Sequence, residues 1–183
     1  MRAVVEICIL AGGLSTRMGR PKARLRLGNL TLLGHVRKNV AELNLPVRII
    51  RKDLVPRCGP LGGIYSALKT TTAEAVLFLP CDTPFLSGAL LRRFLAEFDG
   101  RRPLFGAARK RVGFPILLPR SGLPVLAEQI NERKFALHDL APATNARLLR
   151  VPTRQLFNIN APAALAEARK RWRSAQEQLV KRR

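Results

Sequence analysis

The segment Leu10–Lys22, LAGGLSTRMGRPK, contains the residues of this sequence that are best suited to chemistry. Its glycines lack Cβ atoms, so a ligand can approach the backbone closely, and backbone N–H groups in such a loop can form an anion-binding concavity. Nearby cations complete the requirements for binding a triphosphate. The pattern is neither a P-loop nor the Gly-x-Gly-x-x-Gly dinucleotide motif, and a strand-to-helix turn with ordinary surface arginines is the alternative. The glycines are Gly12, Gly13 and Gly19, and the cations are Arg17, Arg20 and Lys22.

Asp82 is the strongest single candidate for a metal ligand. It follows the apolar run 75–79 and precedes Thr83 and Pro84. A carboxylate at the end of a buried strand is costly unless it binds a cation or accepts hydrogen bonds. Mg²⁺ favours one or two carboxylates together with phosphate oxygens, whereas an Asx-type turn with Thr83 is the purely structural alternative. Beside a phosphate-binding loop, the pattern favours Asp82 as a Mg²⁺ ligand.

Further polar candidates follow other predicted elements. Residues 58–64 form a second glycine-rich segment that opens a helix, and exposed amides at a helix N-terminus bind anions or carbonyl groups. Asp53 either accepts hydrogen bonds from a base or sugar, or is merely solvated. Asn158 and Asn160 are spaced to point the same way on an extended stretch, where they either contact substrate or metal or cap a strand end.

The sequence offers no arrangement typical of a covalent nucleophile. His35 and His138 each lie inside a predicted helix and are interpreted as structural residues. The cysteines, Cys8, Cys58 and Cys81, lack Cys-x-x-Cys spacing and are predicted to be reduced, buried thiols. Phosphate binding and a metal carboxylate without such a nucleophile suit direct nucleotidyl transfer, in which positioning and charge neutralisation supply most of the catalysis.

Alternating strands and helices must position these residues. The pattern predicts βαβ units, hence an α/β fold with a mainly parallel, Rossmann-like sheet, in which ligands bind beyond the carboxyl ends of the strands. Both glycine segments and Asp82 follow strands, so we expect one site at that edge. The predicted strands are 4–10, 47–50, 75–79, 103–108, 113–118 and 147–151, and the predicted helices are 31–43, 59–69, 87–98, 123–130, 134–140 and 161–179. Thr31 and Ser87 are predicted N-caps.

The length of 183 residues fits a single domain, with a nucleotide-binding half over about residues 1–100, an acceptor-binding half over about 101–168 and a basic tail over about 169–183. Residues 170–183 are expected to be disordered or loosely helical, while the preceding helix docks onto the sheet. Ala164, Leu165, Ala168 and Trp172 are its expected docking residues. The sequence has no apolar run of membrane-spanning length and no signal peptide, which predicts a cytoplasmic protein.

The net charge of +21 favours anionic partners such as nucleotides, phosphorylated cofactors, nucleic acid or an anionic membrane surface. The basic residues are spread along the chain, which we interpret as a generally basic surface. Aromatic residues make up only 5% of the sequence, with one Trp and one Tyr, and so offer few base-stacking platforms. Binding to nucleic acid is therefore not expected.

Four motifs together resemble those of the molybdenum cofactor guanylyltransferases. They are Leu-Ala-Gly-Gly-x-Ser-x-Arg-Met-Gly-x-x-Lys at 10–22, Gly-Pro-Leu-Gly-Gly at 59–63, Pro-Cys-Asp-Thr-Pro at 80–84 and Asn-x-Asn-x-Pro at 158–162. The first and third also occur in other nucleotidyltransferases of the same fold. The resemblance implies a three-layer α/β/α sandwich and transfer of GMP from GTP to molybdopterin, with Mg²⁺ and release of pyrophosphate. It also implies a molybdoenzyme or a cofactor-insertion protein as a candidate partner.

The resemblance assigns roles position by position. It implies that Lys22 and Arg17 face the phosphates and that Asp82 holds the metal, which makes these three the catalytic candidates. Residues that match the nucleotide side are Leu10, Ala11, Gly12, Gly13, Asp53, Gly59 and Gly63. Residues on the acceptor side are Asn158, Asn160 and Lys134, the last near a position often held by Arg. Gly12 fits the guanylyl branch, since the cytidylyl branch tends to have alanine there.

The chain also departs from the family pattern. Only Val47–Ile50 precedes Asp53 where relatives usually have two strands, so the sheet is expected to lack one strand. Phe114-Pro115 stands where relatives often have His-Pro. The alternative functions are a related transferase that uses CTP or another NTP on a different phosphorylated acceptor, a basic nucleic-acid-binding protein, and a carrier or chaperone for the cofactor.

Overall fold

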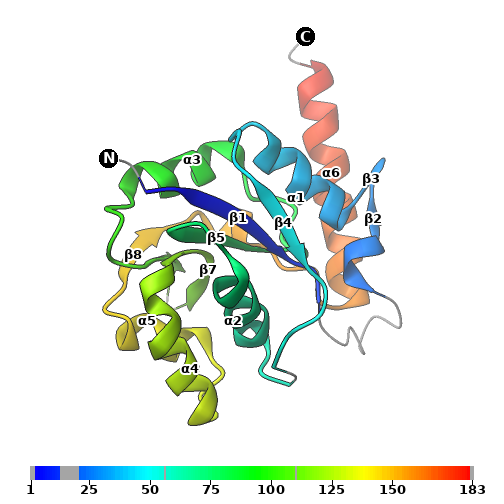
Figure 1. Ribbon diagram of the computed structural model, residues 1–183. Helices are drawn as coiled ribbons and strands as arrows, with labels where there is room; N and C mark the ends of the chain where they lie inside the picture. The colour runs from blue at the N-terminus through cyan, green and yellow to red at the C-terminus, as the bar shows by residue number, and fades with distance from the viewer. Residues whose placement is uncertain (1–2, 13–20, 56, 110, 182–183) are drawn as a thin grey trace.

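A computed structural model describes residues 3–12, 21–55, 57–109 and 111–181. One twisted sheet runs through the molecule with helices on both of its faces, so the fold is the predicted three-layer α/β/α arrangement (Figure 1). The sheet has six strands in the order β4-β1-β5-β7-β6-β8. β7 runs antiparallel to both of its neighbours, and the other paired strands are parallel, which confirms the mainly parallel sheet. The strands are β1 Val5–Leu10, β4 Val47–Ile50, β5 Ala75–Pro80, β6 Leu104–Ala108, β7 Arg111–Pro119 and β8 Arg147–Arg150.

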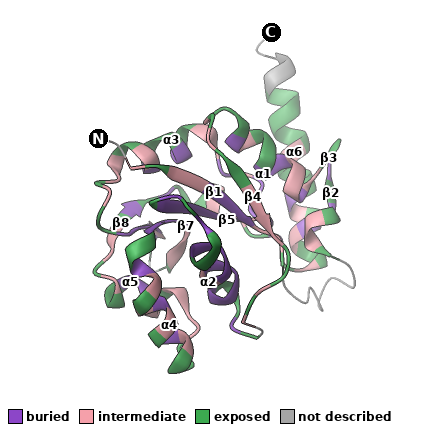
Figure 2. Ribbon diagram, viewed as in Figure 1, coloured by how far each residue is buried: buried purple, intermediate pink, exposed green. Residues whose placement is uncertain are grey.

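The alternation of side chains along each strand divides the interior into two core clusters. Ile7 and Ile9 face α1 (Leu32–Ala41) and α3 (Gly88–Glu97), whereas Cys8 faces the opposite helical layer. That layer consists of α2 (Pro60–Thr70), α4 (Leu123–Asn131) and α5 (Leu137–Ala143). Central β5 is buried almost throughout, as a strand covered on both faces must be (Figure 2).

Local capping signals fix the starts of two helices. The Thr31 hydroxyl accepts a hydrogen bond from the Gly34 N–H at 3.0 Å, and the Ser87 hydroxyl accepts one from the Leu90 N–H at 3.2 Å. Each satisfies a backbone donor that the helix itself leaves free. Both predicted N-caps are confirmed.

The segment between α1 and Asp53 forms the short strand β4, which is an edge of the sheet. As expected, one strand lies between α1 and Asp53, where relatives usually have two. No helix within the described residues is long and apolar enough to cross a lipid bilayer.

The final helix differs from the sequence expectation in where it packs and how far it extends. α6 spans Pro162–Lys181 without a break, because this stretch is rich in Ala, Arg, Gln and Glu, which favour helix. It packs on the small hairpin of β2 (Arg26–Leu27) and β3 (Leu30–Thr31), and the expected docking onto the sheet is replaced by this contact (Figure 1). Leu165 and Ala168 are buried there as expected. The described residues also contain the short 3₁₀ turns η2 Lys22–Arg24, η3 Arg120–Gly122 and η4 Thr153–Leu156.

The start of α5 was predicted wrongly. It begins at Leu137 and not at Lys134, because Arg133 has φ of 57°, a left-handed conformation that ends the preceding helical turn. The Lys134 N–H then donates to the Gln129 carbonyl at 2.9 Å, closing the end of α4. Lys134 consequently lies on the connection between α4 and α5.

Candidate functional site

The segments that carry the candidate residues meet at the carboxyl ends of β1, β4 and β5. The Ala11 N–H donates to the Ile50 carbonyl at 2.8 Å, and the Cys81 N–H donates to the Leu10 carbonyl at 3.0 Å. These bonds extend the parallel pairing just past the last strand residues. The end of the glycine segment, the loop that contains Asp53 and the Asp82 loop therefore lie side by side, as the strand pattern predicted.

Asp82 is a nearly buried carboxylate with only one oxygen satisfied. The residue is 8% exposed, and its Oδ2 lies 3.0 Å from the Lys22 ammonium group. Its Oδ1 is buried and has no hydrogen-bond partner among the described residues. An Asx turn would need an N–H on residue 84, which is Pro84, and the Thr83 hydroxyl donates to the Pro80 carbonyl at 3.2 Å. The structural alternative for Asp82 is thereby removed, and one buried lone-pair acceptor remains for a cation.

The segment that contains Asn158 and Asn160 is joined to the Asp82 loop by a backbone hydrogen bond. Ile159, between them, is completely buried, and its N–H donates to the Asp82 carbonyl at 2.9 Å. Both asparagines are exposed. Burial of the middle residue of an extended triplet turns its two neighbours the other way. The asparagine segment and the Asp82 loop are thus joined although they are far apart in the sequence.

Asp53 lies between the end of β1 and the first turn of α2. A Cβ atom at Gly12 would lie 3.6 Å from Asp53 Oδ1, and Cβ atoms at Gly63 and Gly62 would lie 3.4 Å from Oδ1 and 3.0 Å from Oδ2. Burial raises the pKa of this carboxyl above its usual value. The Leu54 N–H donates to the Ser66 hydroxyl at 2.7 Å, which fixes the Asp53 loop against α2. The structure therefore brings Gly12, Asp53 and Gly63 together, as expected.

Gly62 is a residue of this site that sequence reasoning missed. A Cβ atom there would lie only 2.7 Å from the Val55 carbonyl oxygen. The Gly-Gly pair in the first turn of the helix could have indicated this contact. Glycine weakens a helix, so two glycines there suggest that another part of the chain approaches closely. Gly59 acts differently: it has φ of 55° and ψ of −140° as the N-cap of α2, a conformation suited to glycine.

Several candidates are placed elsewhere or lie beyond the described residues. Gly13 and Arg17 are outside the part of the chain that the structure describes. Lys134 forms an ion pair with Glu132 at 2.9 Å on its own connection, and hydrogen bonding to Glu132 raises the pKa of Lys134. Leu10 borders the Asp53 loop, because a Cβ atom at Gly63 would lie 3.0 Å from Leu10 Cδ2.

The cysteines are buried, and only one of the two histidines is. Burial raises the pKa of Cys8 and of Cys81 to about 12, so neither is a thiolate near neutral pH. His35 is buried, and its Nε2–H donates to the Leu27 carbonyl, with a nitrogen-to-oxygen distance of 2.7 Å. His138 is exposed on α5.

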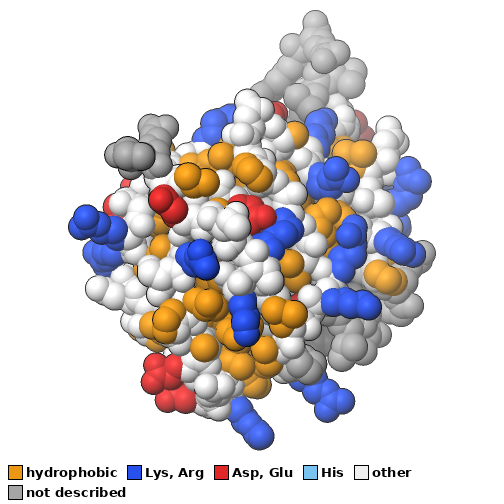
Figure 3. Space-filling view, viewed as in Figure 1, with side chains coloured by type: hydrophobic (Ala, Val, Ile, Leu, Met, Phe, Trp, Pro, Cys, Tyr) orange, Lys and Arg blue, Asp and Glu red, His pale blue; other side chains and the backbone are white. Residues whose placement is uncertain are grey.

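Exposed cations surround the carboxyl edge of the sheet. Arg51 and Lys52 follow β4, Arg109 and Arg111 flank the turn between β6 and β7, and Arg150 ends β8. On the face shown in Figure 3, basic side chains are scattered and do not form one patch. The generally basic surface is thus visible on this face.

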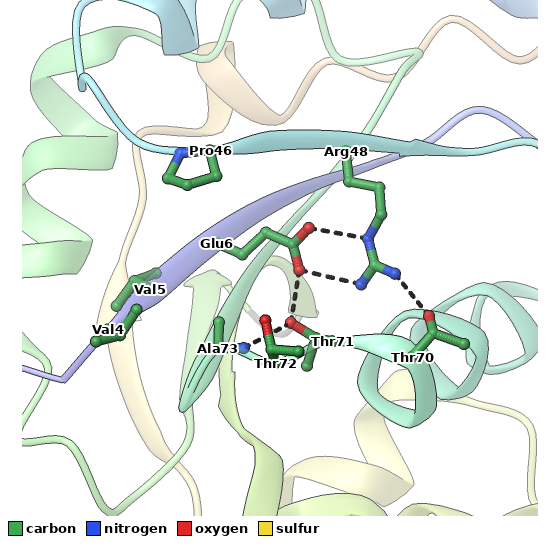
Figure 4. A pocket seen from close by; sticks show the side chains of 9 residues that line it. All are labelled: Val4, Val5, Glu6, Pro46, Arg48, Thr70, Thr71, Thr72 and Ala73. Carbon is green, nitrogen blue, oxygen red and sulfur yellow. Dashed lines mark hydrogen bonds and ion pairs between the residues drawn. The ribbon is translucent and has the colours of Figure 1, made fainter.

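A cavity of about 300 Å³ lies at the opposite, amino end of β1 (Figure 4). Its charged groups, Glu6 and Arg48, bind each other: Arg48 Nε lies 2.9 Å from Glu6 Oε1, and the guanidinium also donates to Thr70 and to the Ala67 carbonyl. The Thr71 hydroxyl donates to Glu6 at 2.7 Å. These groups tie β1, β4 and the end of α2 together, and the cavity is a structural junction.

The comparisons with known proteins agree with this architecture. The family model for the MobA-like NTP transferase domain matches residues 7–144. The probable molybdenum cofactor guanylyltransferase of Carboxydothermus hydrogenoformans is 32% identical over 87% of this chain and 92% of its own length. The molybdenum cofactor guanylyltransferase of Rhizobium leguminosarum is 32% identical over 95% of each chain.

Solved structures share the fold. Molybdopterin-guanine dinucleotide biosynthesis protein A from Archaeoglobus fulgidus superposes with a TM-score of 0.74 at 19% identity, over 90% of this chain and 97% of that one. The 2-C-methyl-D-erythritol 4-phosphate cytidylyltransferase from Thermus thermophilus gives 0.70 at 17% identity, over 94% and 100%. The family model defines this chain as an NTP transferase. Taken with the sequence matches, the chain belongs to the MobA-like NTP transferases, in the family of molybdenum cofactor guanylyltransferases.

The packing of Gly62 against the Asp53 loop gives a direct test of the site's construction. Gly62→Ala places a Cβ atom 2.7 Å from the Val55 carbonyl oxygen, so the Asp53 loop must move. We expect a loss of about 1–3 kcal/mol in the free energy of unfolding, as for overpacking in other cores, together with weaker nucleotide binding. Gly113→Ala is the matched control, since its Cβ would meet nothing closer than 3.7 Å. Denaturant unfolding and GTP titration of both variants check this, and equal behaviour would contradict it.

Proposed function

We propose that this chain transfers GMP from GTP to molybdopterin and releases pyrophosphate, as a molybdenum cofactor guanylyltransferase. The observation that carries the proposal is the Lys22–Asp82 pair, 3.0 Å apart, beside the buried Asp82 Oδ1, to which no described residue donates a hydrogen bond. The pair lies between the glycine segment and the asparagine segment. A cation and a free carboxylate oxygen at this point suit a nucleoside triphosphate, while the names of the full-length relatives support the choice of nucleotide and acceptor.

The residues present fit Mg²⁺. The described residues contain no group of three or more His, Cys, Asp or Glu that could form a dedicated metal cage. Mg²⁺ does not need one, since it is commonly bound by one or two carboxylates plus substrate phosphates. We propose that Asp82 Oδ1 would hold it and that, when bound, it neutralises charge on the phosphate oxygens.

The remaining steps belong to the side chains of this chain. We propose that Lys22 binds the phosphates as a point charge, together with Arg17, and stabilises the charge that develops on the leaving pyrophosphate. The two groups orient the α-phosphorus toward the phosphate of the acceptor. Since positioning and electrostatics supply the catalysis, the reaction needs no covalent enzyme intermediate.

The base side of the nucleotide is assigned to the Gly12–Asp53–α2 junction. We propose that the backbone of residues 10–13, together with Asp53, Gly59 and Gly63, surrounds the guanine nucleoside. In this proposal Leu10, Ala11, Gly12 and Gly13 contribute backbone groups. We propose that the absence of a side chain at Gly12 favours GTP over CTP, in agreement with the family pattern. An alanine Cβ at this position would lie 3.0 Å from the Arg51 carbonyl oxygen and would narrow the space for the base.

The acceptor side is assigned to the asparagine segment. We propose that Asn158 and Asn160 contact the pterin, since both are exposed next to the Asp82 loop. Lys134 is proposed as a more distant acceptor contact, available when its ion pair with Glu132 opens. We further propose that the enzyme works in the cytoplasm and passes its product to a molybdoenzyme or a cofactor-insertion protein.

Product analysis with each of the four NTPs, with and without purified molybdopterin, tests the proposed function. We expect a guanylylated pterin and one equivalent of pyrophosphate from GTP, and only when molybdopterin is present. Comparable product from CTP would favour the cytidylyl alternative. Binding without product under all conditions would favour a carrier, and either outcome would overturn the proposal.

The role of Asp82 gives a quantitative prediction. Asp82→Asn removes one charge at the proposed metal position and should lower the transfer rate on the order of 10²-fold or more, which is the effect of losing about 2.7 kcal/mol of transition-state stabilisation. The matched control is Glu128→Gln, an exposed acid on α4 that is expected to leave the rate unchanged. Steady-state turnover of both folded variants is the measurement. Near-normal turnover of Asp82→Asn would exclude the metal assignment.

A further inference from the structure

A third core cluster joins the Lys22 turn, the Asp82 loop and the asparagine segment to the C-terminal helix. We call it the C-terminal cluster; its buried members are Leu25, Leu27, Leu32, Ile159, Leu165 and Ala168, and Phe85, Phe157 and Trp172 pack against it. The cluster lies where α6 passes the β2–β3 hairpin and α1 (Figure 1). It is separate from the two clusters that fill the faces of the sheet.

One side of the C-terminal cluster fixes the backbone that carries Lys22. The Leu25 N–H donates to the Lys22 carbonyl at 3.0 Å, and the Leu32 N–H donates to the Leu25 carbonyl at 2.8 Å. Leu25 and Leu27 are 4% and 0% exposed. A lysine side chain has many rotamers, so holding its ammonium group at one point requires a fixed backbone. Burial of these leucines supplies that constraint.

The opposite side of the cluster fixes the Asp82 loop and the asparagines. Ile159 is a buried member and donates its N–H to the Asp82 carbonyl at 2.9 Å. Phe85, which follows Asp82 closely in the chain, meets Phe157 edge to face, with ring centroids 6.1 Å apart. The two partners of the Lys22–Asp82 ion pair are thus held by the same apolar cluster.

Trp172 closes this cluster from α6. Its ring meets the buried His35 ring at a centroid distance of 4.6 Å and an angle of 69°, and His35 in turn donates to the Leu27 carbonyl at 2.7 Å. Gly28 has φ of 60°, and a Cβ atom there would lie 2.5 Å from the indole nitrogen of Trp172. The indole therefore packs directly on the turn of the hairpin. Beyond it, residues 173–178 of α6 are exposed.

We propose that Trp172 is a positioning residue, which holds Lys22 in register with Asp82 by pressing the hairpin against the C-terminal cluster. The expected effect on kcat/KM rests on the proposed function, whereas the expected effect on GTP affinity requires only that the chain binds GTP. The helix through Trp172 is then part of the active-site framework, and the exposed residues beyond it are dispensable for transfer. In this proposal the basic residues beyond Trp172 do not contribute to the site.

A double-mutant cycle on Trp172 and Lys22 tests this proposal. Trp172→Ala should lower kcat/KM for GTP by about 10- to 100-fold, the range expected when a catalytic group is misplaced by a fraction of an ångström to 1 Å. Lys22→Ala should cause at least as large a loss. Because Trp172 acts through Lys22, adding Trp172→Ala to Lys22→Ala should cost little more, so the two losses are not additive. Trp172→Phe retains a ring against His35 and should retain most of the activity.

Matched controls separate positioning from general stability. Leu126→Ala creates a cavity in another core cluster and should lower the melting temperature. Any loss of kcat/KM that it causes should add fully to the loss caused by Lys22→Ala. A chain ended after residue 173 should be as active as the parent. Full additivity of Trp172→Ala with Lys22→Ala, or unchanged kcat/KM at a reduced melting temperature, would overturn the proposal. Trp172→Leu takes the place of Trp172→Ala in the cycle where the alanine variant does not fold.

The same cycle is measured as GTP affinity by titration calorimetry, without any acceptor. If the parent yields no product with molybdopterin but the affinities are non-additive, the proposed acceptor is wrong and the positioning role stands. If the parent yields product and the affinities are additive, the positioning role fails and the proposed function stands.

Discussion

The site depends on an ion pair that is only half satisfied. Asp82 has one oxygen bound to Lys22 at 3.0 Å, and its other oxygen is buried without a partner in the part of the chain that the structure describes. Burying a charged carboxylate in this way is unfavourable, and a pair built only for stability would be expected to satisfy both oxygens. The unpaired oxygen is therefore best understood as a ligand position, which a cation and the phosphates of a nucleotide would complete.

The fold brings the two partners of this pair together from opposite directions. The buried strand β5 delivers Asp82 to the carboxyl edge of the sheet, where β1 and β4 deliver the glycine segment and Asp53. Lys22 comes from outside the sheet, on a turn whose hairpin is packed against α6. Because one apolar cluster also holds Ile159, the nucleotide side and the asparagine segment share a single support. A chain with a net charge of +21 thus relies on apolar packing to place Lys22.

The sequence predicted those features that have local causes. Thr31 and Ser87 predicted two helix starts because a capping hydroxyl acts on the next turn of the same chain. Strand ends predicted the convergence of the two glycine segments and Asp82, since parallel strands share a carboxyl edge. Features with long-range causes were not predicted. Nothing near Trp172 indicates its contact with Gly28. Gly62 is explained by its close approach to the Val55 carbonyl and to Asp53, and the left-handed Arg133 that displaces the start of α5 has no local signal.

The most direct test of this account is the effect of Mg²⁺ on GTP affinity, measured by titration calorimetry for the parent and for Asp82→Asn. If Asp82 Oδ1 completes a cation site shared with the phosphates, Mg²⁺ should tighten GTP binding to the parent at least about tenfold, a change of about 1.4 kcal/mol. The same addition should have little effect on Asp82→Asn. Equal tightening in both proteins would contradict the account, because the metal would then be bound without the carboxylate on which the site is built.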